Sequence, residues 1–145
     1  MMKLKQYLLA LALVLGGLSM VQAQSTKKML TKGWRFSFEG MMENMPEIEK
    51  QQMSKMSEEQ RTKMKAMIEQ SYIVFKSGGT AKASMNGKEE EMTWKLSDND
   101  KLLTTTEKNG KVSRLKIIKI TKDSLVLQEE SDTKGVMLVF KPKVD

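Results

Sequence analysis

The residues best suited to chemistry in this sequence are methionines, which recur with a period of 11 residues. The pattern Met-x-x-Met-x-Glu begins at Met42, Met53 and Met64. Eleven residues are close to three turns of an α-helix, so in one helix the methionine pairs return to the same face. Such a stripe most often packs against a core, because methionine fills irregular gaps between other side chains.

Two further uses of the methionine stripe remain open. Its pliable thioethers suit a lid that adapts to a bound apolar molecule or to a partner. Sulfur donors also suit Cu(I), and Trp34 and Met41 would be available to contribute to such a site. The copper hypothesis is weakened because the chain has no histidine and no cysteine. We therefore predict no metal and no cofactor.

The common types of catalytic site lack their residues in this chain. Without histidine and cysteine, there is no imidazole base, no thiolate and no ordinary zinc site. Glutamates cluster at 89–91 and at 129–130, but both clusters lie next to expected turns, where carboxylates are normally solvated. Residues 98–100 resemble a fragment of a calcium-binding loop without its glycine and distal glutamate. We expect no catalytic residue and no enzymatic activity.

The first 23 residues have the layout of a secretory signal peptide. Two lysines precede an apolar run at residues 7–18, and Ala23 ends a small-residue cleavage pattern. The run is shorter than the roughly 20 residues that span a membrane, and no cysteine follows it to carry a lipid. We expect residues 1–23 to be removed and residues 24–145 to be periplasmic or secreted, without a membrane span.

The composition favours one small globular domain and argues against nucleic-acid binding. Residues 24–145 are long enough to bury a single hydrophobic core. The chain carries a formal net charge of +7, but its lysines are scattered and its arginines are only Arg35, Arg61 and Arg114. A nucleic-acid site needs basic residues concentrated on one face with aromatic residues between them. We therefore expect no nucleic-acid partner.

The segment at about 41–70 is expected to be helical. It is rich in Met, Glu, Gln and Lys and has no β-branched run, a composition typical of helices. Pro46 suits a first helical turn, and Ser57 with Gln60 forms a capping-box pattern. Two short helices, or one helix with a break near Ser57, satisfy both signals.

Eight strands can be identified from alternating residues and from the turns between them. Trp34, Phe36 and Phe38 alternate with polar residues in the first strand, which gives it an aromatic inner face. Asn86-Gly87 and Asn109-Gly110 are strong turn signals, because a type I′ turn needs positive φ at both central residues. The later strands are expected at about 72–77, 80–86, 90–97, 101–107, 111–121, 124–130 and 135–141.

This order of strands predicts a mainly β fold, an eight-stranded antiparallel up-and-down barrel with a Met-rich helical insertion between strands 1 and 2. Closure removes the unpaired edges that a flat sheet would expose. In the strand at 111–121 the apolar residues change face between Ile117 and Ile118, which indicates a β-bulge.

A closed barrel has an interior, and small residues that point into it leave space. Ala81, Ala83 and Met85 share one face of the third strand, and Leu102 shares a face with Thr104 and Thr106 on the fifth. An eight-stranded barrel either fills itself or holds one small ligand. The residues predicted to bind a ligand are Trp34, Phe36, Phe38, Met53, Met56, Met64, Met67, Ala83, Met85, Trp94 and Leu102.

Short motifs in the expected strands and turns can be compared with known families. They are Lys32-Gly33-Trp34, Tyr72 to Lys76 with Gly78-Gly79-Thr80, Thr93 to Ser97, Lys116 to Thr121, Asp123 to Leu127 and Met137 to Lys141. With these motifs the chain resembles the lipocalin-like domains of secreted Bacteroidota proteins over nearly all of residues 24–145. The resemblance implies a protein that binds an apolar ligand and does not catalyse a reaction.

The leading hypothesis is an exported lipocalin-like protein that binds a small apolar or amphipathic molecule, with the Met-rich insertion gating the barrel. The first alternative is a structural or interaction module of the cell envelope, with a filled barrel and an envelope protein as its partner. The second is a methionine-based Cu(I)-binding protein. An enclosed cavity would favour the first hypothesis over the filled barrel.

Overall fold

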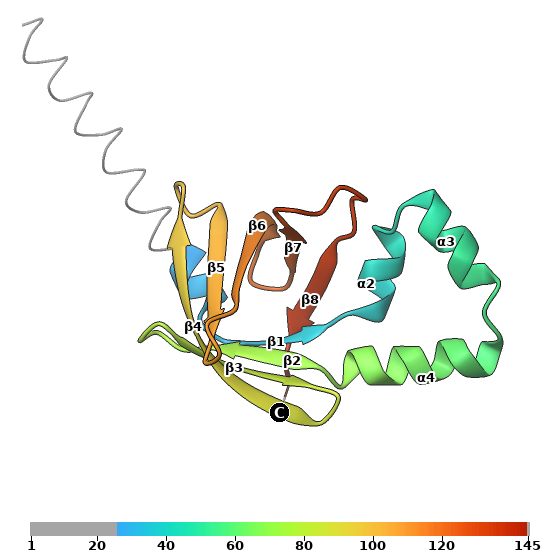
Figure 1. Cartoon of the computed structure of the whole chain (residues 1–145), viewed down its shortest axis with the longest axis horizontal. Helices are drawn as coiled ribbons and strands as arrows, with labels where there is room; N and C mark the ends of the chain where they lie inside the picture. Colours follow the sequence, from blue (N-terminus) through green and yellow to red (C-terminus); the bar gives the residue numbers. More distant parts are fainter. Residues whose placement is uncertain (1–25, 145) are drawn as a thin grey trace, which may run out of the picture.

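The computed structural model describes residues 26–144 and shows a β-barrel from which helices project to one side (Figure 1). The signal peptide expected at residues 1–23 lies outside the described residues. Each strand pairs antiparallel with the next along the chain, and the last pairs with the first, which closes the barrel. The strands are β1 (Gly33–Phe36), β2 (Tyr72–Phe75), β3 (Thr80–Met85), β4 (Lys88–Ser97), β5 (Leu102–Glu107), β6 (Val112–Ile120), β7 (Leu125–Glu129) and β8 (Leu138–Pro142). The predicted eight-stranded up-and-down barrel is confirmed.

The turns follow the local chemistry of their residues. Asn86 and Gly87 have φ of 54° and 78°, the pair of left-handed conformations that a type I′ hairpin needs. At the β5–β6 turn only Gly110 is left-handed, and the backbone N–H of Lys111 donates to Oδ1 of Asn109 at 2.9 Å. The turn at 98–100 holds three consecutive residues with positive φ, a conformation that Asp and Asn tolerate better than most residues.

The β-bulge predicted in β6 is present. The register between β6 and β7 shifts between Ile117 and Lys119, and Ile118 at the shift is half exposed. Because one extra residue is inserted, Leu115 and Ile117 before the shift and Ile120 after it all pack against the core. The change of face in the sequence therefore reflects a bulge.

One end of the barrel is closed by the segment that precedes β1. Residues 26–30 are helical, Leu30 is completely buried, and its carbonyl oxygen accepts a hydrogen bond from Nε1 of Trp34 at 3.0 Å. Lys32 places its Nζ 4.4 Å from the centre of the Trp34 ring and donates to the carbonyl oxygen of Lys122 in the β6–β7 turn. We call this the closed end.

Three helices separate β1 from β2: α2 (Phe38–Glu43), α3 (Glu47–Ser54) and α4 (Glu58–Glu69). The capping box at the start of α4 is confirmed, since the Gln60 N–H donates to Ser57 Oγ and the Ser57 N–H to Gln60 Oε1, both at 3.2 Å. The expectation that Phe38 belongs to the first strand was wrong. Ser37 caps α2 by accepting from the Gly40 N–H at 3.1 Å, so the chain turns helical at Phe38.

The short helix α2 attaches the insertion to the outside of the barrel. It contacts β8, and a Cβ on Gly40 would lie 2.4 Å from Cγ1 of Val139, so glycine is required for this close approach. By contrast, α3 and α4 contain no buried residue. They extend away from the barrel (Figure 1), and we call residues 47–69 the helical arm.

Candidate ligand-binding site

The strand register defines which side chains face the barrel interior. Trp94 pairs with Thr105 and Leu96 with Leu103, and Trp94, Leu96 and Leu103 all belong to the core. The inward face of β5 therefore carries Leu103 and Thr105. The prediction that Leu102 faces the interior was wrong. Both leucines at the start of β5 are buried, so hydrophobicity alone does not distinguish the two faces.

A packed core fills the interior on the side of the closed end. Trp94 meets Phe75 edge to face with ring centres 5.5 Å apart, and its Nε1 lies 2.9 Å from the carbonyl oxygen of Thr80. Phe140 of this core contacts the half-buried Phe36, with ring centres 4.3 Å apart and ring planes tilted by 44°. The buried members of this core are Leu30, Trp34, Phe75, Ala81, Trp94, Leu103, Leu125, Leu127 and Phe140.

The opposite end of the barrel is bounded by the β3–β4 and β5–β6 turns, by the β7–β8 loop and by the chain that enters and leaves the helices. We call it the open end. Inward-facing apolar side chains that are only half buried occur toward this end, as they do beside the β6–β7 turn. They include Phe36, Met92, Leu115 and Leu138. The barrel therefore offers a partly exposed apolar lining on this side.

Carboxylates follow these apolar residues at the inner rim of the open end. Glu90 pairs with Ala83, Glu107 with Met92 and Glu129 with Leu115, so all three glutamates continue the inward face of their strands. Glu90 and Glu129 are exposed. Glu107 is half buried, and its Oε2 atom is buried without a hydrogen-bond partner among residues 26–144.

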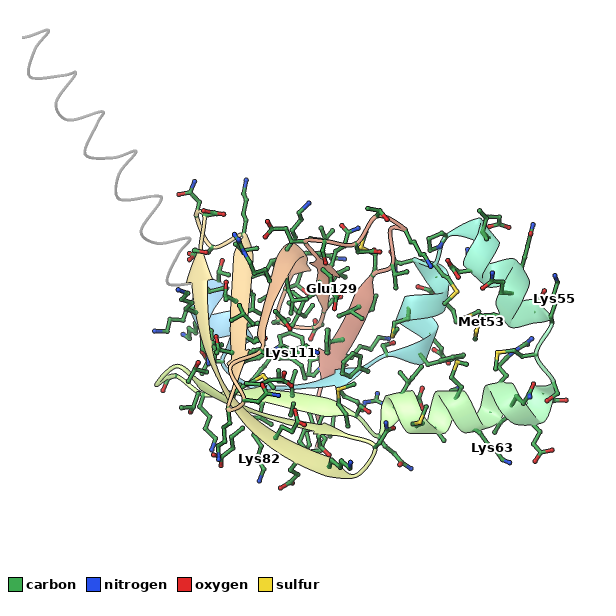
Figure 2. The ribbon with its side chains drawn as sticks, viewed as in Figure 1. Met53, Lys55, Lys63, Lys82, Lys111 and Glu129 are labelled. Atoms are coloured by element: carbon green, nitrogen blue, oxygen red, sulfur yellow. The ribbon has the colours of Figure 1, made fainter. Side chains whose placement is uncertain are left out.

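Three open hollows lie along the strands that reach this region. Two of them, of about 480 and 490 Å³, adjoin along β3, β4 and β5 and share Lys82, Glu91, Glu107 and Lys108, and most of their lining comes from the outer face of the sheet. The third, of about 550 Å³, lies between the start of β6 and the end of β7, where Lys111 and Glu129 are found (Figure 2). None of these three hollows is enclosed, and none is lined by the aromatic residues of the core.

The outer face around the open end is electrostatically balanced. Lys82 forms an ion pair with Glu89 at 3.0 Å, Lys108 with Glu91 at 3.3 Å. The hydrogen bond from Lys82, with its charge, lowers the pKa of Glu89, and Glu89 raises the pKa of Lys82 in return. Both groups are exposed, so solvent screens the pair and its contribution to stability is small.

A hydrogen-bonded aspartate organises the loop between β7 and β8. The backbone N–H groups of Lys134 and Val136 donate to the Asp132 carboxylate at 3.0 and 2.7 Å. These bonds, first that from Lys134, lower the pKa of Asp132, because they favour the charged form.

The residues predicted to bind a ligand are divided among several places. Trp34 and Trp94 belong to the packed core, while Phe36 and Ala83 face inward. Met85 ends β3 beside the hairpin turn and is 53% exposed. Phe38 is buried in α2, outside the barrel core.

The methionines of the helical arm do not join the barrel interior in this structure. Met53, Met56 and Met64 are half buried and Met67 is 49% exposed. Met53 points from α3 toward α4 (Figure 2). The methionine pairs do not share one helical face, because the helix breaks before Pro46 and again before Ser57. The first two pairs therefore span helix ends.

Sequence reasoning missed the inward residues nearest the open end. The predicted ligand-binding residues do not include Met92, Glu107, Ser113, Leu115 and Leu138, although register places all of them on the inner face. If Trp94 is taken as inward and the alternation of inward and outward side chains is continued through the β4–β5 turn, such residues could have been identified. Glutamate at the end of a strand is usually solvated, so the sequence offered no reason to assign Glu107 to the site.

Comparison with known proteins gives one match. The family model of the lipocalin-like domain matches residues 42–127, from α2 to β7. No curated protein and no solved structure matches the chain. Within residues 26–144, no helix is long and apolar enough to cross a bilayer. No group of three or more His, Cys, Asp or Glu side chains suited to a metal ion occurs in this described part of the chain.

Proposed function

The chain belongs to the lipocalin-like domain family, and on that premise we propose that it is an exported, non-catalytic protein that binds one small apolar or amphipathic molecule at the open end of its barrel. The observation that carries the proposal is the unequal burial of the inward side chains. Core residues such as Trp34 and Leu103 are completely buried, whereas Met92, Leu115 and Leu138 face the same interior and remain partly exposed.

The physical reason is that partly exposed apolar residues inside a barrel lose water contact when an apolar ligand covers them. Burial of apolar surface contributes about 25 cal/mol per Å², so a ligand that covers several half-exposed side chains is stabilised without moving the core. The closed end supplies a rigid floor for such a ligand. The open hollows beside Glu107 and Glu129 would admit it.

Export and the absence of catalysis are parts of the same proposal. Export is supported by the signal-peptide pattern of residues 1–23. A role in binding rather than catalysis is supported by the lack of histidine and cysteine throughout the sequence, which removes the common bases and nucleophiles.

The proposal can be tested by blocking the interior from one strand. Ser113 is half buried and pairs with Thr105 on the inward face, whereas Lys116 of the same strand pairs with Leu102 and is exposed on the outer face. We expect Ser113→Trp to weaken binding of the apolar fluorophore N-phenyl-1-naphthylamine by about tenfold or more. Lys116→Trp places the same side chain outside and is expected to leave the affinity unchanged.

The same pair of variants distinguishes the filled-barrel alternative. If the space beside Ser113 is already occupied, Ser113→Trp overpacks the interior and lowers the melting temperature by more than about 5 °C. That result, with no saturable binding by the natural chain, would favour an interaction module. Two observations favour this second candidate. None of the three hollows is enclosed, and the helical arm exposes 70% of Ile48 and buries no residue.

Native mass spectrometry of the protein purified from its own cells gives an independent test. A retained mass of a few hundred daltons would support the binding function and help to identify the ligand. Repeating the measurement after addition of Cu(I) tests the methionine hypothesis, since a copper-sized increment is expected only if the thioethers bind the metal.

A further inference from the structure

The glutamates near the open end fall into two groups according to the face of the sheet. On the outer face, Glu89, Glu91 and Glu130 each form an ion pair, the last with Arg114 at 3.2 Å. The inward glutamates, at positions 90, 107 and 129, form no ion pair within the described part of the chain. The barrel thus neutralises its outer carboxylates with its own cations and leaves the inner ones unneutralised.

Among the inward glutamates, Glu107 is the one that is half buried, whereas Glu90 and Glu129 are exposed. It faces Met92 across the β4–β5 pair, one inward position beyond the buried Thr105. The β5–β6 turn fixes its backbone, because its N–H donates to the carbonyl oxygen of Lys111 and its carbonyl oxygen accepts from the N–H of Gly110, both at 2.9 Å.

The Oε2 atom of Glu107 is an acceptor without a donor. It is buried and has no hydrogen-bond partner among residues 26–144. A buried carboxylate oxygen without a donor is unfavourable, because it has lost water without gaining a replacement. The lysine next in sequence, Lys108, is already paired with Glu91 on the outer face.

Building on the proposed function, we propose that the ligand is a cationic amphiphile, a primary amine on an apolar body, and that Glu107 binds its ammonium group. An ammonium carries three N–H donors and a positive charge. One N–H would supply the hydrogen bond that Oε2 lacks, and the charge would neutralise the carboxylate. The apolar body then covers Met92 and Leu115. Glu90 and Glu129 on the same inner face reinforce the preference for a cation over an anion.

Two cations near the rim act against this preference, but only weakly. Lys88, at the tip of the β3–β4 hairpin, lies on the same inner face of β4 as Glu90. Lys111 follows Gly110 at the β5–β6 turn. Both are exposed, so solvent and salt screen their charges. Glu107 is the more buried group, so its charge is screened less than theirs.

The test compares three amphiphiles that share a dodecyl chain: dodecylammonium, dodecyltrimethylammonium and dodecanoate, each below its micelle concentration. Binding is measured at neutral pH by isothermal titration calorimetry. We expect dodecylammonium to bind most tightly, because it alone combines the charge with N–H donors, and dodecanoate to bind least tightly. Charged hydrogen bonds of this kind correspond to about tenfold or more in affinity.

Matched glutamine variants assign the preference to one carboxylate. Glu107→Gln keeps the shape and removes the charge, and we expect it to weaken dodecylammonium binding by about tenfold while dodecanoate binding changes little. Glu59→Gln is the control, because Glu59 is exposed on α4, pairs with Lys63 at 3.1 Å and lines none of the three hollows. It is expected to change neither affinity. Thermal denaturation of both variants checks that each remains folded.

The outcomes separate this inference from the function on which it rests. If dodecanoate binds as tightly as dodecylammonium, or if Glu107→Gln leaves the dodecylammonium affinity unchanged, the amine proposal is wrong. The binding function still stands in that case, provided that Ser113→Trp reduces binding of N-phenyl-1-naphthylamine. If no amphiphile and no fluorophore binds, both proposals fail.

Discussion

The two ends of the barrel use the same strand alternation with different results. At the closed end Leu30, Trp34, Leu103 and Leu125 are completely buried, and Trp34 and Leu30 are joined by a hydrogen bond. At the open end the inward positions become methionine, serine and glutamate, and burial is incomplete. The difference shows that one continuous sheet can supply stability at one end and a binding surface at the other.

The difference predicts first that shortening a side chain at the closed end to alanine destabilises the protein far more than the same change near the open end. Trp34→Ala removes a completely buried ring and is expected to lower the free energy of unfolding by about 3–5 kcal/mol. Leu115→Ala removes a half-buried side chain and is expected to lower it by less than about 2 kcal/mol. Urea denaturation monitored by circular dichroism measures both, and equal losses would contradict the comparison.

The attachment of α2 to β8 gives the next largest effect. Alanine is normally favoured over glycine within a helix by about 1 kcal/mol, but a Cβ at position 40 would lie 2.4 Å from Val139. We expect Gly40→Ala to destabilise the protein by about 1–3 kcal/mol. Combining it with Val139→Ala tests the contact, since relief of the clash requires the double variant to be more stable than the sum of the single effects.

The helical arm should lose structure without affecting the barrel. Ser57→Ala removes the hydrogen bond from the Gln60 N–H to Ser57 Oγ. The bond from the backbone N–H of residue 57 to Gln60 Oε1 can still form. Caps contribute about 1 kcal/mol to a helix. Because α3 and α4 bury no residue, we expect faster amide hydrogen exchange in α4 and an unchanged urea midpoint for the barrel. A matching shift of that midpoint would show that the arm and barrel unfold together.

The smallest effect concerns Asp132 in the loop at the open end. Its pKa is lowered by the backbone N–H of Lys134, so its carboxylate stabilises the folded state above the unfolded pKa, and that contribution is lost as the pH falls through the folded pKa. We expect Asp132→Asn to be slightly less stable than the natural chain at pH 7. The gap should close in acid, below the usual aspartate value of 3.8. A gap that is constant from neutral to acid pH would disagree with this assignment.

Most of the fold could be predicted because turn residues and alternation act locally. The Asn86-Gly87 turn, the change of face near Ile118 and the Ser57 capping box each specify one feature, and the structure contains all three. The lipocalin-like family was also predicted, and the family match confirms it.

Less of the candidate site could be predicted, because its residues are defined by long-range register and by burial. Leu102 and Leu103 are both buried. Which of them faces the barrel interior becomes clear only when the pairing of β5 with Trp94 is known. The methionine period assumed one helix, and the cap residues Pro46 and Ser57 divide it. Nothing in the local sequence of Glu107 distinguishes it from the solvated glutamates of the outer face.

The central claim, that ligands bind at the open end of the barrel, is tested most directly by nuclear magnetic resonance. The natural chain is labelled with nitrogen-15 and titrated with N-phenyl-1-naphthylamine. We predict that the amide signals of Met92, Glu107, Ser113 and Leu115 shift, while the indole N–H signals of Trp34 and Trp94, bonded to backbone carbonyls in the packed core, stay in place. Shifts confined to the helical arm, or no saturable shift in the barrel, would contradict the claim.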